Sequence, residues 1–233
     1  MTGDMIIDTM EFYEQPRLKL ARDVKKGKYI RLKRNLYCTD YETSRMSLAQ
    51  AIYGPSYISF DYALSYYGLI PEHAYNVSSA TFKKRKDKRF VTDVCSFYYS
   101  DVPASVYPYG VDILNIDRIG VRIATPEKAL CDKLYKMSPA SGRSDFEDLL
   151  FEYLRVFDDS LQDLDANLIK GLSKLYRCRN VEFLSAMLGR YHADYARFPY
   201  RHLHEGREHD SEQHKGIGSG GHSLRPRTRR VLR

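Results

Sequence analysis

The alternation of apolar and polar positions is clearest over residues 55–71, where it predicts a strand end followed by a short helix. Residues 57–58 have the aromatic and β-branched character of a strand. Ala63, Leu64 and Tyr67 are spaced to share one face of a helix. We expect this stretch to join a small N-terminal module to a larger body.

The same stretch contains the signals that begin and end its helix. Ser59 is a candidate N-cap, and Asp61 complements the positive helix end. Gly68 can adopt the left-handed conformation that ends a helix, and Pro71 prevents its continuation. We interpret the tyrosines here as packing residues: Tyr57, Tyr62, Tyr66 and Tyr67.

Apolar periodicity predicts two helices before this stretch, over 4–14 and 17–26. Residues 29–32 and 36–38 then predict two short strands, with residues 33–35 as the turn between them. This order of two helices and a hairpin is typical of a winged helix-turn-helix, although a full module has three helices before the wing. In that module a helix enters the major groove of DNA and the wing contacts the adjacent backbone.

Basic residues lie on both the second helix and the hairpin tip, which favours DNA binding over a solvated basic helix packed on a hairpin. A further helix is predicted over 44–53, and Gly54-Pro55 is the best candidate boundary of the module. The candidate DNA-binding residues are Arg17, Lys19, Arg22, Lys25, Lys26, Lys28, Arg31, Lys33 and Arg34.

The pattern after residue 71 predicts a small, mostly antiparallel sheet followed by helices. Strands are expected at 73–80 and 90–99, and a strand pair at 112–116 and 121–124. Thr125 is a predicted N-cap with Pro126 in the first helical position, and residues 144–147 fit a capping box. Two more helices are expected, over 165–176 and 180–191. The predicted fold class is therefore α+β, with a helical C-terminal half.

The composition indicates a hydrophobic core and a net positive charge. The chain has 233 residues, 43% of them apolar, with 20 Tyr, 10 Phe and no Trp, so tyrosine and phenylalanine must supply the large core side chains. The net charge of +7 suggests an anionic partner, of which nucleic acid is the commonest. The four cysteines are widely spaced, which argues against a zinc site or a disulfide framework. With neither a signal peptide nor an apolar spanning segment, we expect a cytoplasmic protein with no membrane contact.

Two further segments carry charge. The basic residues of 83–89 are interpreted as a solvated hairpin tip rather than as a second phosphate contact, because charged runs usually are solvated. Residues 201–233 lose apolar periodicity and contain five of the seven histidines, which predicts a disordered basic tail. Two interpretations of this tail stay open: it binds an anionic partner, or it is a non-native end of the chain.

The sequence lacks the motifs of common catalytic and phosphate-binding sites, so we expect neither an enzyme nor a cofactor or metal. The carboxylates of 142–148 are better explained by a helix start than by a metal site. Glu127 and Asp132 are interpreted as helix-surface residues rather than as a general acid and base.

Three segments together resemble the AbiEi family, the antitoxins of bacterial type IV (abortive infection) toxin–antitoxin systems. They are YISFDYALSYYGLI at 57–70, RIATPEKALCD at 122–132 and RNLY at 34–37. The resemblance covers about residues 15–195. The two longer motifs are fairly specific together, whereas the short one is weak.

The resemblance implies a transcriptional autorepressor that binds operator DNA upstream of its own operon through an N-terminal winged helix-turn-helix. It also implies a C-terminal antitoxin domain that counteracts a nucleotidyltransferase-like toxin without a stable complex. A homodimer would suit a palindromic operator. The implied domains are residues 1–54, 55–200 and a tail at 201–233, and the short N-terminal module and the tail depart from the family pattern.

Two alternatives come from other classes of protein. One is an antitoxin that acts through protein interaction with a degenerate N-terminus and no DNA binding. The other is an enzyme acting on nucleic acid or nucleotide, which would need buried carboxylates that converge in a pocket.

Overall fold

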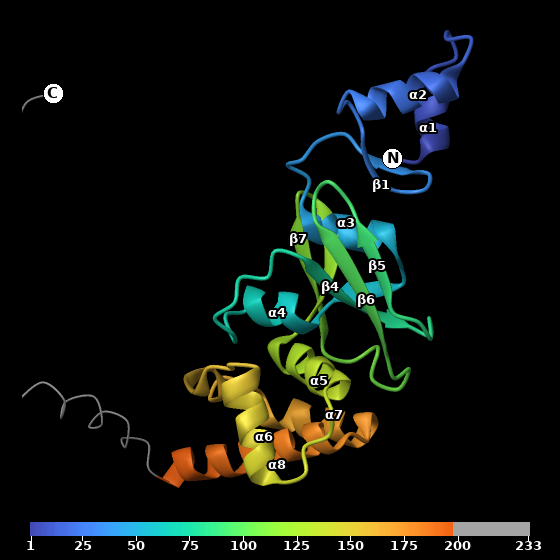
Figure 1. Cartoon of the computed structure of the whole chain (residues 1–233). Coiled ribbons are helices and arrows are strands. Elements are labelled where there is room, and N and C mark those ends of the chain that lie inside the picture. Colours follow the sequence, from blue (N-terminus) through green and yellow to red (C-terminus); the bar gives the residue numbers. More distant parts are fainter. Residues whose placement is uncertain (198–233) are drawn as a thin grey trace, which may run out of the picture. The chain divides into compact units, whose positions relative to one another are not determined.

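A six-stranded mixed sheet forms the middle of the chain in the computed structural model, which describes residues 1–197 (Figure 1). The strand order is β5-β6-β4-β3-β8-β7. The β3–β4, β5–β6 and β7–β8 pairs are antiparallel, whereas β3–β8 and β4–β6 are parallel. The strands are β3 (Ser56–Ile58), β4 (Val77–Phe82), β5 (Lys88–Val91), β6 (Ser96–Val102), β7 (Val111–Ile116) and β8 (Ile119–Ala124).

The single strand predicted over 90–99 is wrong, because the chain turns inside it and forms β5 and β6. The Thr92 hydroxyl holds this turn by accepting hydrogen bonds from the backbone N–H groups of Val94 and Cys95, both at 3.2 Å. Such local side-chain bonding competes with continued strand pairing. The pair at 111–124 forms as expected, with Asp117 and Arg118 as its two-residue turn.

Helices α3 (Arg45–Ile52), α4 (Phe60–Tyr66) and α5 (Pro126–Lys136) pack against the sheet. The Tyr99 hydroxyl donates to the Ala49 carbonyl oxygen at 2.7 Å, and the Gln50 side chain bonds backbone groups of β8. The buried side chains of α3 therefore belong to the large core. A division of the chain at residues 54–55 stays a prediction.

After β8 the described chain is helical, as expected. The segments that follow α5 are α6 (Arg143–Glu147), the π-helical η1 (Asp148–Tyr153), the 3-10 helix η2 (Asp158–Leu161), α7 (Ala166–Tyr176) and α8 (Arg179–Arg197). The predicted capping box is wrong: Gly142 is the N-cap of α6, and the Glu147 carboxylate pairs with Arg143 at 2.8 Å. The Thr125 cap of α5 is confirmed, since its side chain accepts from the Lys128 N–H.

The N-terminal segment contains α1 (Gly3–Asp8), α2 (Pro16–Lys25), β1 (Ile30–Lys33) and β2 (Leu36–Cys38). Ile6, Met10 and Leu20 form a small core of their own between the two helices. Helix α1 is shorter than predicted, because the Thr9 hydroxyl donates to the Ile6 carbonyl and the chain turns there.

The hairpin is attached to the larger body through its buried face. Ile30, Leu32 and Cys38 join the large core, and β1 lies against β5. Within the described residues, no helix is long and apolar enough to cross a membrane. The tail predicted over 201–233 lies outside the described residues.

Candidate nucleic-acid interface

The nine predicted DNA-binding residues lie on α2, on the turn that follows it and on the hairpin β1–β2. Pro16 occupies the start of α2, and Gly27, with φ of 75°, ends it in the left-handed conformation. Asn35 takes a φ of 60° in the hairpin turn, a conformation that asparagine tolerates better than most residues. The elements that carry the basic residues are thus fixed by local signals.

Four of the nine come together around one pocket of about 610 Å³. Arg17 and Lys25 reach it from α2, and Arg31 and Arg34 reach it from the hairpin; Leu20 contributes to its apolar wall. All four cations are exposed, and none forms an ion pair within the described part of the chain. The pocket therefore presents cations from two elements toward one space.

The pocket also contains one acid. Asp4 lines it, and its Oδ2 accepts a hydrogen bond of 2.8 Å from the Asn35 side chain. This bond ties α1 to the tip of the hairpin. The net charge of the lining remains positive, because four cations face one carboxylate.

Two other predicted residues are engaged with Asp23, which is 3% exposed. Lys19 forms an i,i+4 ion pair with it, and the Lys28 ammonium lies 3.8 Å from its second oxygen. The hydrogen bond from Lys19 lowers the pKa of Asp23 and, reciprocally, raises that of Lys19. These lysines stabilise α2 and its following turn.

Lys33 has a structural role that the sequence did not indicate. It is half-buried, and its ammonium donates to the backbone carbonyl of Ile52 at the end of α3. Arg22 and Lys26 are exposed but do not line the pocket. The nine residues therefore divide into four around the pocket, three held by local contacts, and two that are exposed on α2 and at its C-cap.

A second polar cluster, which sequence reasoning missed, is buried where β3 meets α5 and α7. The Lys128 ammonium lies 2.8 Å from Asp132 Oδ1, and both side chains are 0% exposed. The interpretation of Asp132 as a helix-surface residue is wrong. Glu127 is buried as well, and its Oε1 accepts from the Asp165 N–H at 3.0 Å.

Three hydroxyl groups complete the surroundings of Asp132. Tyr57 and Ser59 donate to Oδ2 at 2.9 and 2.7 Å, and Tyr176 donates to Oδ1. Burial, followed by the charge of Asp132, raises the pKa values of Tyr57 and Tyr176 well above the usual tyrosine value. Ser59 was predicted as a helix cap, but its hydroxyl makes no capping bond because it is used here.

This buried cluster joins several elements, since its members come from β3, the N-cap of α4, α5 and α7. The Lys128 ammonium also donates to the Tyr176 hydroxyl and lies 5.5 Å from the centre of the Tyr57 ring. Every polar atom of the cluster thus has a partner inside the protein. Such an arrangement stabilises the packing of these elements.

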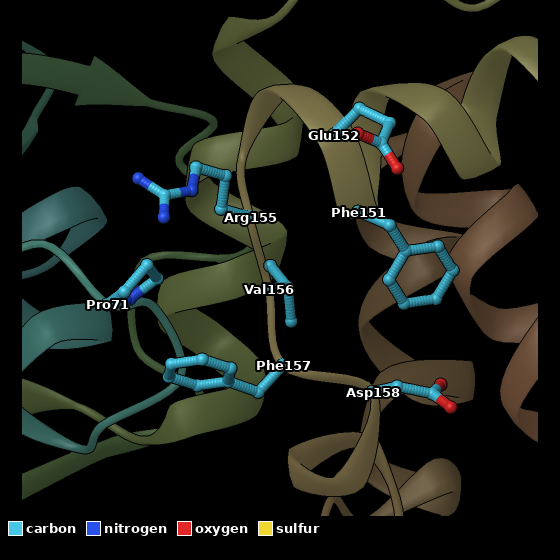
Figure 2. Close-up of a pocket in the computed structure, with 7 residues that line it drawn as sticks. All are labelled: Pro71, Phe151, Glu152, Arg155, Val156, Phe157 and Asp158. Carbon is cyan, nitrogen blue, oxygen red and sulfur yellow. The ribbon is translucent and has the colours of Figure 1, made fainter. Parts of the chain in front are cut away.

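A further pocket, of about 570 Å³, lies beside the segment that follows η1. Figure 2 shows Arg155 and Phe157 directed to one side of this segment and Phe151 to the other. Arg155 is paired with Glu72 at 2.8 Å. Because its side chains diverge, this pocket does not present a set of groups to one ligand atom. No group of three or more potential metal ligands occurs among the described residues.

The chain was compared with known proteins at two levels. It matches none of the protein-family models searched. A search of curated proteins likewise gave no significant match. The resemblance to AbiEi antitoxins therefore stays a hypothesis supported by three sequence motifs.

Proposed function

We propose that this protein is a DNA-binding autorepressor and the antitoxin of a type IV toxin–antitoxin system. The observation that carries the DNA-binding half is the set of exposed cations that α2 and the hairpin direct to one pocket. Phosphate contacts from lysine and arginine supply most of the affinity of such proteins for DNA. The antitoxin half is supported by the motifs at 57–70 and 122–132.

In this proposal α2 and the hairpin act as the helix and wing of a winged helix-turn-helix-like module. Helix α2 would approach the major groove, and Arg31 and Arg34 would contact the backbone beside it. The partner is operator DNA upstream of the protein's own operon, bound by a homodimer if the operator is palindromic. The toxin counteracted would be a nucleotidyltransferase-like protein that forms no stable complex with it.

The DNA-binding half is tested by titrating the protein with DNA from upstream of its own gene over a series of salt concentrations. Replacing Arg17 and Arg34 by Gln should weaken binding and reduce the slope of log affinity against log salt by about 1.8, since each phosphate contact contributes about 0.9. The matched control replaces Lys170 and Lys174, exposed on α7, by Gln. If both double variants bind alike, the assignment to α2 and the hairpin is wrong.

The alternative is an antitoxin that does not read DNA. The same Arg17→Gln, Arg34→Gln variant separates the two functions, because it is altered only on the N-terminal surface. Growth rescue from a co-expressed toxin encoded beside this gene should persist in this variant. Rescue by a wild-type protein that binds no DNA even at low salt would favour the alternative.

A further inference from the structure

The loop between β4 and β5 is the most strongly charged exposed segment of the described chain. Six of the seven residues of 83–89, which comprise this loop and the first two residues of β5, are basic, and most are exposed. Its one acid, Asp87, pairs with Lys136 at 3.5 Å, and the loop's own cations have no acidic partner within the described residues. Like charges at this density repel one another and favour an anionic ligand.

This loop is held in one shape, which a merely solvated tip would not require. Lys83 and Arg85 have positive φ angles of 53° and 60°, a conformation that is strained for these residues. The Asp101 carboxylate accepts hydrogen bonds from the backbone N–H groups of Lys84 and Arg85, at 3.0 and 2.8 Å, and from the Thr81 hydroxyl. Partial burial opposes them, but these bonds lower the pKa of Asp101, so it stays charged.

The loop also does not form the hairpin tip that the sequence predicted. Strand β4 pairs with β6 in parallel, and β5 pairs with β6 on the other side, so the loop passes across the end of β6. It leads directly into β5, which is the edge strand of the sheet (Figure 1). The charged segment is therefore continuous with the edge strand of the sheet, against which β1 lies.

An exposed aromatic surface lies beside it on β5 and β6. Phe97 and Tyr99 of β6 are buried, so Tyr98 between them lies on the opposite face of the sheet, where it is 37% exposed. Arg89 pairs with Tyr98 across the strands, and its guanidinium lies 5.2 Å from the ring centre. Val91, two residues along β5, is 70% exposed.

We propose that this face, comprising residues 83–89 with Val91 and Tyr98, binds single-stranded nucleic acid. Single strands offer both phosphates for the loop and unstacked bases for an aromatic ring on a sheet. A duplex would use the cations but would leave Tyr98 and Val91 without a partner. Strand β1 of the N-terminal hairpin lies against β5, but this surface contains none of the nine predicted DNA-binding residues, so the inference does not depend on operator binding.

The test measures fluorescence anisotropy of a labelled, mixed-sequence oligonucleotide of about 12 nucleotides, within the usual range for one such site. The full chain is titrated with single-stranded DNA, single-stranded RNA and the duplex of the same sequence. We expect tighter binding of the single strands than of the duplex. Wild-type protein that binds no single strand at low salt would overturn the proposal.

Variants then distinguish stacking from charge. Tyr98→Ala should weaken single-strand binding about tenfold, whereas Tyr98→Phe should retain it, since stacking needs the ring and not the hydroxyl. Arg85→Gln, Lys86→Gln and Lys88→Gln together should reduce the slope of log affinity against log salt by about 2, because each phosphate contact on a single strand contributes about 0.7. If Tyr98→Ala is without effect while the triple variant weakens single strands and duplex equally, the loop is a duplex contact and the proposal is wrong.

Two controls keep these results interpretable. The charge-matched variant Lys170→Gln, Lys174→Gln, Arg190→Gln should leave single-strand affinity unchanged. The Arg17→Gln, Arg34→Gln variant should weaken operator binding without weakening single-strand binding. Failure of operator binding and failure of single-strand binding are thus separate outcomes of the same set of proteins.

Discussion

At the scale of residues, the buried pair of Lys128 and Asp132 has the largest energetic consequence. Each charge would cost several kcal/mol to bury alone, and the attraction between them offsets this only because hydrogen bonds satisfy their remaining polar groups. Tyr57, Ser59 and Tyr176 provide those bonds to Asp132. Loss of one charge therefore leaves the other uncompensated.

We predict that Lys128→Met lowers the free energy of unfolding by about 3–5 kcal/mol, because it leaves a buried carboxylate without its cation. The double variant Lys128→Met, Asp132→Asn should be less destabilised than the single one, since its amide carries no net charge, its oxygen can accept from hydroxyls and its NH2 group can donate to a hydroxyl oxygen. Urea denaturation of the wild type and both variants measures this. Equal or greater destabilisation of the double variant would show that the charge of Asp132 is not what makes the single variant unstable.

The sequence could not reveal this cluster, and the reason is geometric. Lysine and aspartate four positions apart are usual on an exposed helix face, where they form a weak surface pair. Tyr57 and Tyr176 are brought to them only by the packing of β3 and α7. The one local signal is the apolar run between Lys128 and Asp132, because a helix that is apolar on most sides is buried.

At the scale of elements, the β7–β8 hairpin illustrates a strained turn. Asp117 and Arg118 have φ angles of 51° and 64°, which a two-residue type I′ turn requires. Glycine is favoured at such positions, whereas arginine has a steric cost of about 1–2 kcal/mol there. The chain retains this cost at an exposed turn.

We expect Arg118→Gly to stabilise the protein by up to about 1 kcal/mol, after the extra entropy of glycine in the unfolded chain is deducted. The control Arg118→Ala removes the same side chain but keeps the strain, so its effect should stay within about 0.5 kcal/mol. Thermal unfolding of the two variants gives the comparison. Equal stabilisation by both would attribute the effect to the arginine side chain instead of the backbone.

Helix ends set by capping residues were predictable from the sequence, whereas turns set by other hydrogen bonds between side chain and backbone were not. The start of α5 at Thr125 and Pro126 and the end of α4 before Gly68 follow known capping rules. The turn at Thr92 was missed, because the surrounding residues have high β-propensity and predict one continuous strand. The Thr92 hydroxyl instead accepts hydrogen bonds from two backbone N–H groups, and the strand ends there. The capping box at 144–147 fitted the sequence rule, but the helix begins two residues too early to use it.

At the scale of the whole molecule, tyrosine replaces the absent tryptophan as the large core residue. Tyr57, Tyr99 and Tyr176 are buried, and burial is the largest cause that raises the pKa of each above the usual value of 10.0. Their neutral forms are therefore part of the native state. In the unfolded chain the same hydroxyls ionise near the ordinary value.

These raised pKa values predict a steep loss of stability in alkali. Below pH 10 the tyrosines are protonated in both states; above it the unfolded chain loses protons that the native state keeps, so stability falls. Each tyrosine contributes about 1.4 kcal/mol per pH unit, or about 4 kcal/mol per unit for the three. Urea denaturation between about pH 8 and pH 11 measures this slope.

Tyr99→Phe provides the matched control for the alkaline slope. It removes one titrating hydroxyl together with its hydrogen bond to Ala49, so the variant should be less stable at neutral pH. Above pH 10 its free energy of unfolding should nevertheless fall less steeply than that of the wild type, by about 1.4 kcal/mol per pH unit. An unchanged slope would mean that Tyr99 ionises within the folded protein.

The α+β class was predictable from the strand-then-helix order, but the arrangement of the sheet was not. Neighbouring strands pair as β3–β4, β5–β6 and β7–β8, which a sequence pattern can indicate. The two parallel pairs join strands that are distant along the chain, and no local rule specifies them. The surface formed by β5 and β6 was missed for a different reason, because the sequence predicted one strand over 90–99 where the chain forms two.

The parallel pairing of β3 with β8 has a consequence for how the chain is made. Ile58 meets Ile123, so the partner of β3 is synthesised about 65 residues after it. At the usual rate of translation that interval is roughly 3–13 seconds. Until β8 is made, β3 can pair only with β4, which follows it after α4, and one edge of what becomes the centre of the sheet stays open on the ribosome.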